Sequence, residues 1–269
     1  MPRIDVDGDR LHYTQNGTGI PVIFIHGSCG AAAQWKVLAG MLSDQFKTIC
    51  LDLFGSGESE PWPIEREWSP RDDDRAIDAI LSLVNEPVHF VVHSGGGCFS
   101  WPTIKNRAGQ IRSLTFFEPV YFHLLRQSAN ALFAEPEAMA KRYRQLMEAG
   151  DRDAAMASFV DTWARKDGTW NGLPNTVKNA MKLGSDRLYH EWLVLWFDEP
   201  SLDELAELDI PTLLFVGTET LASEYRVCEL IGQALPDWDI QTVEGAGHMA
   251  PFTHASSVFS SLVMHLDAN

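Results

Sequence analysis

The chain has 269 residues, 45% of them hydrophobic and 22% charged, a composition typical of a soluble globular protein with one large domain or two smaller ones. Its formal charge of −16 disfavours nucleic acid, an anionic membrane surface and polyanionic substrates as partners. No apolar run approaches the ~18 residues of a membrane span, and the N-terminus does not resemble a secretory signal. The four cysteines are not spaced like metal ligands. We therefore expect a cytoplasmic protein with reduced thiols.

Short apolar runs alternate with helical segments in the first 121 residues. Short apolar or alternating runs bounded by turn residues predict strands. Apolar residues that recur at helical spacing predict helices. The predicted strands are 10–17, 21–27, 48–57, 88–94 and 111–120, and the predicted helices are 31–44, 69–84 and 98–109. Ser69 as N-cap and Pro70 at the first helical position mark one helix start. Pro102 is expected to kink the third helix or to limit its hydrogen bonding.

The pattern changes between residues 122 and 201, where only helical segments are found. They are 136–150, 152–166, 174–184 and 186–197. Alternation then resumes with strands at 210–217 and 238–245 and helices at 223–235 and 255–266. Alternating strands and helices imply a mostly parallel sheet of about eight strands flanked by helices, an α/β fold. We therefore predict a core formed by 1–121 and 202–269 and an inserted helical cap formed by 122–201.

The stretch FVVHSGGGCFSW, residues 90–101, combines a buried-type strand with three consecutive glycines. Glycine is used where a side chain has no room or φ must be positive, so a very tight turn is expected with Ser94 at its tip. A strand, a serine between small residues and a helix form the arrangement called a nucleophile elbow. A phosphate-binding role is disfavoured, because neither the P-loop nor the dinucleotide glycine pattern is present.

Together with HGSCG at 26–30, DLFGSGES at 52–59 and GAGHMAPF at 245–252, the elbow resembles the α/β-hydrolase family over nearly the whole chain. The resemblance implies Ser94 as nucleophile, His248 as catalytic base, and the backbone N–H groups of Ser28 and Gly95 as an oxyanion hole. The sequence departs from the family pattern at Val92, where a glycine is usual. A serine hydroxyl needs a nearby base to become a good nucleophile, and the near-neutral titration of an unperturbed histidine suits that task.

The acid of the triad is not where the family usually has it, because Thr220 occupies that position. Two substitutes remain open. Glu219 is adjacent, but neighbouring residues of an extended segment point to opposite sides. Glu118 closes the strand 111–120 at the carboxyl edge of the sheet, where α/β active sites gather, and the surrounding residues resemble a branch of the family with its acid after this strand. Glu118 is the favoured acid and Glu219 the alternative.

The insertion carries aromatic residues that can either pack the cap or roof a pocket. Trp192 and Trp196 share one helical face, and with His123 they are the predicted substrate-pocket residues. Trp163 and Trp170 lie in the same insertion.

The predicted function is a serine hydrolase that acts on a small, largely apolar ester or related acyl compound through Ser94, His248 and Glu118. No metal or organic cofactor is implied, and the elbow aspartate of dehalogenases and epoxide hydrolases is absent. Fold alone leaves other chemistry open: C–C bond hydrolysis, lyase activity or cofactor-free haloperoxidase activity. A ligand-binding relative without turnover is the alternative from another class. The sequence does not reveal the oligomeric state.

Overall fold

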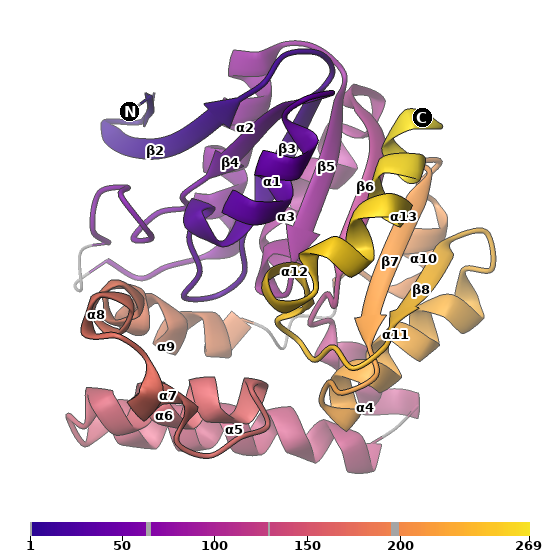
Figure 1. Ribbon diagram of the computed structural model, residues 1–269. Helices are drawn as coiled ribbons and strands as arrows, with labels where there is room; N and C mark the ends of the chain where they lie inside the picture. Colours follow the sequence, from indigo (N-terminus) through magenta and orange to yellow (C-terminus); the bar gives the residue numbers. More distant parts are fainter. Residues whose placement is uncertain (1, 63–65, 129, 195–198) are drawn as a thin grey trace.

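The computed structural model describes residues 2–62, 66–128, 130–194 and 199–269. Its centre is an eight-stranded sheet with the order β1-β2-β4-β3-β5-β6-β7-β8 (Figure 1). The strands are β1 (Arg3–Val6), β2 (Asp9–Asn16), β3 (Pro21–Ile25), β4 (Lys47–Leu51), β5 (Val88–His93), β6 (Ile111–Phe117), β7 (Thr212–Gly217) and β8 (Asp239–Val243). β2 pairs antiparallel with β1 and β4, and the pairs from β4 to β8 are parallel. The predicted mostly parallel α/β fold is confirmed.

The inner strands are buried on both faces, which explains their continuous apolar sequences. In β3, Val22 and Phe24 belong to one apolar cluster, whereas Ile23 and Ile25 belong to another. Successive side chains of a strand point to opposite faces, so the sheet separates two apolar layers.

Helices cover both faces of the sheet (Figure 1). Those packed with the core are η1 (Ala32–Trp35), α1 (Lys36–Leu42), α2 (Pro70–Val84), α3 (Gly95–Asn106), η2 (Ala108–Gln110), α10 (Leu202–Ala206), α11 (Ala222–Ala234), α12 (Ala250–Thr253) and α13 (Ala255–Asp267). α1 and α13 contact one another on one face, and α2 contacts α3 on the other. The predicted N-cap is present at α2, where the N–H and hydroxyl of Ser69 both donate to the Asp72 carboxylate.

The described helices between β6 and α10 form a layer beyond the carboxyl ends of the parallel strands (Figure 1). Its helices are η3 (Phe122–Leu124), α4 (Leu125–Ser128), α5 (Asn130–Glu148), α6 (Arg152–Trp163), α7 (Thr169–Gly172), α8 (Asn175–Leu183) and α9 (Ser185–Val194). The described residues between 122 and 201 include no strand. Buried side chains of this layer, Tyr143, Met156 and Trp163 among them, are continuous with the apolar cluster under α2 and α3.

Within the described ranges, no helix combines the length and the apolar character needed to cross a membrane. α3 runs through Pro102, and α5 starts before Pro136 and includes it, so neither proline ends its helix. A proline inside a helix removes one backbone hydrogen bond of that helix.

Candidate active site

Ser94 lies at the junction of β5 and α3 with a backbone conformation that is unusual for a residue with a side chain. Its φ is 56° and its ψ is −131°, and it is buried. The Ser94 N–H donates to the carbonyl of Phe117 at 2.9 Å, and its own carbonyl accepts from Gly97 N–H at 3.0 Å. Strain of this kind persists only where the surrounding structure fixes it, and it is typical of functional sites.

The loop after β3 lies directly against this serine. A Cβ atom on Gly27 would come within 3.2 Å of the Ser94 Oγ, and one on Gly95 would come within 2.8 Å of the Ser28 Oγ. The three segments that carry Gly27–Ser28, Ser94 and Gly95 therefore meet at one point. Gly95 is the first residue of α3, so its N–H has no acceptor within the helix and is available to an oxyanion.

His26 fixes the conformation of that loop. Its Nδ1–H donates to the Gly27 carbonyl at 2.8 Å, and its Nε2 accepts from the Leu53 N–H at 3.1 Å. Burial lowers the pKa of His26 to about 4. The neutral ring thus fixes this loop through hydrogen bonds of both ring nitrogens.

Glu118 and His248 form a buried pair. The His248 Nδ1–H donates to the Glu118 Oε2 at 2.7 Å, and the two side chains are 4% and 2% exposed. The Gly217 N–H donates to the other carboxylate oxygen at 2.8 Å, and the Thr220 hydroxyl donates to Oε2 at 2.7 Å. This arrangement leaves the His248 Nε2 lone pair free to accept a proton, which is what a general base requires.

His93, next to Ser94 in sequence, links the elbow to the loop of His248. Its Nε2–H donates to the His248 carbonyl at 2.9 Å, its Nδ1 accepts from the Gln34 amide at 3.2 Å, and the two imidazole rings are 4.7 Å apart. Burial, and then the adjacent His248, hold the pKa of His93 well below its usual range. Residues 94 and 248 are therefore brought to the same edge of the sheet, although the hydrogen bonds of the described residues include none between the Ser94 hydroxyl and His248. Catalytic hydrogen bonds are often long before substrate binds.

Glu219, the alternative acid, lies elsewhere. Its carboxylate is 65% exposed and is 3.6 Å from the Arg165 guanidinium. Its neighbour Thr220, which we expected only to replace the usual acid, donates its hydroxyl to Glu118. Of the two candidate carboxylates, Glu118 is the one that contacts His248.

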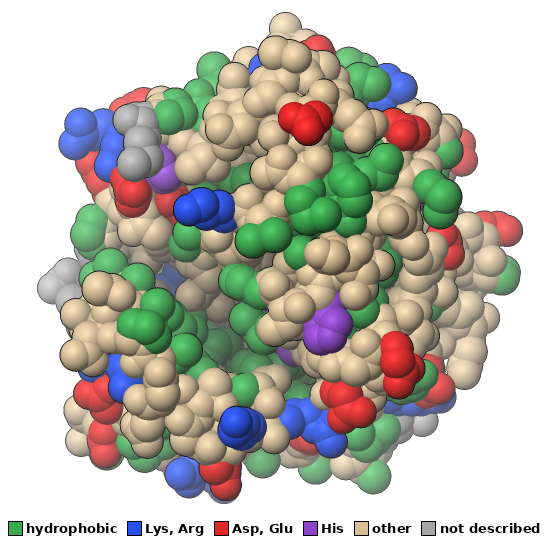
Figure 2. Space-filling view, viewed as in Figure 1, with side chains coloured by type: hydrophobic (Ala, Val, Ile, Leu, Met, Phe, Trp, Pro, Cys, Tyr) green, Lys and Arg blue, Asp and Glu red, His purple; other side chains and the backbone are tan. Residues whose placement is uncertain are grey.

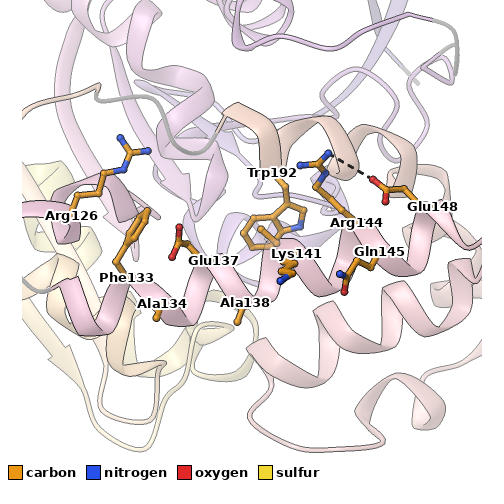
Figure 3. A pocket seen from close by; sticks show the side chains of 11 residues that line it. Arg126, Phe133, Ala134, Glu137, Ala138, Lys141, Arg144, Gln145, Glu148 and Trp192 are labelled. Atoms are coloured by element: carbon orange, nitrogen blue, oxygen red, sulfur yellow. Dashed lines mark ion pairs between the residues drawn. The ribbon is translucent and has the colours of Figure 1, made fainter.

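Of the three predicted pocket residues, His123 and Trp192 belong to the described part of the chain. His123 bonds the Pro200 carbonyl at 2.8 Å. Trp192 is buried and lines a groove of about 820 Å³ along α5, with Phe133, Ala138 and other residues of that helix (Figure 3). Neither Ser94 nor His248 lines this groove. Trp196 lies outside the described residues.

A cluster of buried charges joins the helical layer to the core behind the elbow. Arg187 of α9 donates to both oxygens of Asp73 in α2, at 3.1 and 2.5 Å, to Glu191 at 2.5 Å and to the Phe54 carbonyl at 2.7 Å. Its guanidinium also lies 5.2 Å from the centre of the Phe99 ring. Burial raises the pKa of Asp73 to about 7, even though Arg187 opposes the shift.

Sequence patterns gave no sign of this cluster or of one aromatic contact at the site. Trp163 of α6 stacks on the His248 ring with centroids 3.8 Å apart and an interplanar angle of 23°. Only its place in the insertion was visible in the sequence.

The outer surface is hollowed between the core and the helical layer, and hydrophobic side chains gather along the hollow (Figure 2).

Comparisons with known proteins agree with this architecture. A family model described as alpha/beta hydrolase fold matches residues 20–255. A haloalkane dehalogenase of Agrobacterium fabrum (strain C58 / ATCC 33970) is 24% identical over 136 residues, or 50% of this chain and 42% of that protein. The matched part of the chain thus spans less than half of that relative's length.

Two solved structures cover nearly the whole chain. An esterase from Thermogutta terrifontis is 20% identical with a TM-score of 0.74, covering 100% of this chain and 99% of the other. A bromoperoxidase from Bacillus anthracis is 20% identical with a TM-score of 0.76, covering 96% of each chain. At these identities, the likeness establishes the fold and carries no information on the reaction.

Proposed function

Because the chain belongs to the α/β-hydrolase fold family, we propose that it is a serine hydrolase of a small, largely apolar ester or related acyl compound. The observation that supports this most is the buried hydrogen bond from His248 to Glu118 beside the strained Ser94. A base oriented by a carboxylate next to a serine hydroxyl is the arrangement that activates an oxygen nucleophile.

In the proposed reaction, the Ser94 Oγ attacks the substrate carbonyl carbon while its proton passes to the His248 Nε2. The negative oxygen of the tetrahedral intermediate accepts hydrogen bonds from the N–H groups of Ser28 and Gly95, an interaction worth roughly 3 kcal/mol for each donor. Collapse of the intermediate releases the alcohol, which takes the proton from His248, and leaves an acyl ester on Ser94. Water activated by the same base then hydrolyses this ester to the acid and regenerates the serine.

The serine at the elbow makes the proposed reaction different from dehalogenation, the activity in the name of the Agrobacterium fabrum relative. Dehalogenases and epoxide hydrolases of this fold attack carbon with an elbow aspartate, and this chain has Ser94 instead. The apolar substrate preference is supported by Phe99 and Trp163, which border Gly95 and His248, and by the hydrophobic hollow between the layers (Figure 2).

A fluorophosphonate probe tests the proposal directly. We expect stoichiometric labelling of the wild-type protein and complete loss of labelling in Ser94→Ala. Ser100→Ala is the matched control, because this buried serine lies on the same helix α3 and makes no hydrogen bond through its hydroxyl in the structure. Labelled Ser94→Ala, or unlabelled wild type, would refute acyl chemistry at this site. Hydrolysis of p-nitrophenyl esters, compared with cleavage of diketones, then distinguishes ester from C–C bond hydrolysis.

A further inference from the structure

Trp163 of the helical layer stacks on one face of the His248 ring. The indole is nearly parallel to the imidazole, its centroid is 3.8 Å away, and the Trp163 side chain is itself buried. Trp163 ends α6, so its position depends on how that helix sits on the core. A cation over the face of an aromatic ring is attracted by the ring quadrupole, most strongly by that of tryptophan.

We propose that Trp163 is a positioning residue, which holds the His248 imidazole in plane and stabilises its imidazolium form when that ring carries the proton from Ser94. This inference rests on the proposed function for the step that it assists, but the stacking and its effect on protonation do not depend on turnover. It makes proton transfer depend on the docking of the helical layer, because without α6 in place the imidazolium loses this partner.

The same segment also contacts the loop that supports Glu118. Arg165, two residues after Trp163, donates from its guanidinium to the carbonyls of Glu219 and Thr220 at 3.0 and 3.2 Å. Thr220 in turn donates its hydroxyl to Glu118. Residues 163–165 thus touch the base through one side chain and the acid's support through another, so that one displacement of this segment disturbs both.

The charge on the His248 ring also depends on the other titratable groups near it. Glu118 faces the Nδ1 side, and His93 faces the ring from β5. Burial, and then the Glu118 carboxylate, raise the pKa of Glu224 of α11 well above its usual range. The Arg165–Glu219 pair is largely solvent-exposed. Of these described groups, the Glu118 carboxylate and the Trp163 indole contact the His248 ring in positions that favour a positive charge on it.

Trp163→Phe and Trp163→Leu test the proposal through the pH profile of ester hydrolysis. Both variants keep an apolar side chain over the ring, but the quadrupole weakens from Trp to Phe and vanishes in Leu. We expect kcat/KM on the neutral-pH plateau to fall roughly two- to threefold in Trp163→Phe and roughly tenfold in Trp163→Leu. The midpoint of the acidic limb should move to lower pH in the same order, by roughly half to one pH unit for Leu.

Trp170→Phe is the matched control for loosening of the helical layer. Trp170 is buried in the same insertion and lies near Lys178 and Lys182, not near His248. We expect its acidic limb to stay in place even if the plateau falls. A limb that is unmoved in Trp163→Leu, or that moves to higher pH because water reaches the ring, would overturn the proposal.

A spectroscopic readout separates this inference from the proposed function. A protonated imidazole in contact with an indole quenches the fluorescence of the indole. We therefore expect the tryptophan emission of Ser94→Ala to fall as the pH is lowered through the range of the acidic limb. The change should disappear in Ser94→Ala/Trp163→Phe and in Ser94→Ala/His248→Gln, and persist in Ser94→Ala/Trp170→Phe. An equal change in all four proteins would refute the stacking role, whereas a failed fluorophosphonate reaction alone would refute only the serine chemistry.

Discussion

Glu118 is held by three hydrogen bonds at once, from the His248 imidazole, the Gly217 N–H and the Thr220 hydroxyl. Its φ of 44° lies in the left-handed region, which is uncommon for a residue with a side chain. Strain at this position is maintained by the contacts that aim the carboxylate at His248. Such a carboxylate orients the imidazole and stabilises its positive form.

The change Glu118→Gln therefore lowers activity without removing the side chain's bulk. We expect kcat/KM for a p-nitrophenyl ester to fall by roughly 10³–10⁴-fold, because a neutral amide no longer stabilises the imidazolium or fixes the tautomer. Steady-state kinetics measure the loss, and the affinity for an unreactive ester analogue should hold.

Glu219→Gln is the control for this experiment, because its exposed carboxylate contacts Arg165. Its kcat/KM should stay within about twofold of the wild type, as is usual for exposed ion pairs of small energy. If Glu219→Gln lost activity and Glu118→Gln retained it, our assignment of the acid would be wrong.

The residue types of the site were recognisable in the sequence, but their contacts were not. Glycines around Ser94 and before His248 mark tight turns in a local pattern. Thr220 shows the limit of such patterns, since its position suggested a missing acid and its hydroxyl instead supports the acid from another strand.

At the scale of elements, the site depends on how closely α3 approaches β3. A Cβ atom on Gly96 would lie 2.7 Å from the His26 carbonyl oxygen and 3.0 Å from that of Ile25. Both neighbours are backbone atoms of the strand end that carries the oxyanion loop, so they cannot rotate away. Glycine at this position lets the first turn of α3 pack directly on that loop.

We therefore expect Gly96→Ala to lower the free energy of unfolding by roughly 1–3 kcal/mol, the usual cost of overpacking. Activity should fall as well, because the displaced helix carries Gly95. Urea unfolding followed by circular dichroism measures the stability.

Gly40→Ala, in another helix of the core, is expected to change the stability in the opposite direction. Gly40 is exposed in α1, and a Cβ atom there would meet nothing within 4 Å. Alanine is a better helix former than glycine, so stability should rise by up to about 1 kcal/mol. Equal stability changes in the two variants would contradict a steric role for Gly96.

Secondary structure was predictable because each element carries its own signal. Continuous apolar runs predicted the inner strands, and an N-cap followed by proline predicted the start of α2. The orientation of α6 and α9 on the core was not predictable, since the apolar face of a helix can pack against any apolar surface of suitable shape.

For the whole molecule, three buried histidines set the response to acid. Burial lowers the pKa of His26 and of His89 to about 4 and holds that of His93 well below its usual range. In the unfolded chain, histidines titrate near 6.5, so below that pH the unfolded state binds more protons than the folded state. These groups therefore stabilise the fold fully above about pH 6.5 and progressively less as the pH falls toward 4.

The contribution of Asp73 to stability changes with pH in the opposite direction, because its pKa is raised to about 7 in the folded protein. Its contribution is largest below about pH 4 and declines as the pH rises toward 7. The raised pKa of Glu224 acts in the same direction as that of Asp73, and the lowered pKa of His265 adds to the three buried histidines. Two carboxyls therefore oppose four imidazoles, and the free energy of unfolding should decrease from pH 7 to pH 4.5.

Urea unfolding at several pH values between 4.5 and 7.5 measures this slope, and His89→Gln should reduce it. His89 is suited to this test because it lies away from the site and its ring contacts Ser113. A stability that is constant or rises toward pH 4.5 would show that these rings are not held in their neutral form.

The sequence by itself determined seven of the eight strands of the α/β pattern, the helical segments between residues 122 and 201, the elbow at Ser94 and the chain order Ser94, Glu118, His248, but not the first strand, Arg3–Val6. These features depend on short-range regularities: apolar periodicity, glycine at tight turns and capping residues. Only the tertiary structure decided that Glu118 reaches His248, 130 residues away, and that Thr220 supports it. It also decided that Trp163 contacts the site and that Arg187 joins the helical layer to the core. Such contacts join separate elements, and their geometry follows from packing that no local sequence pattern encodes.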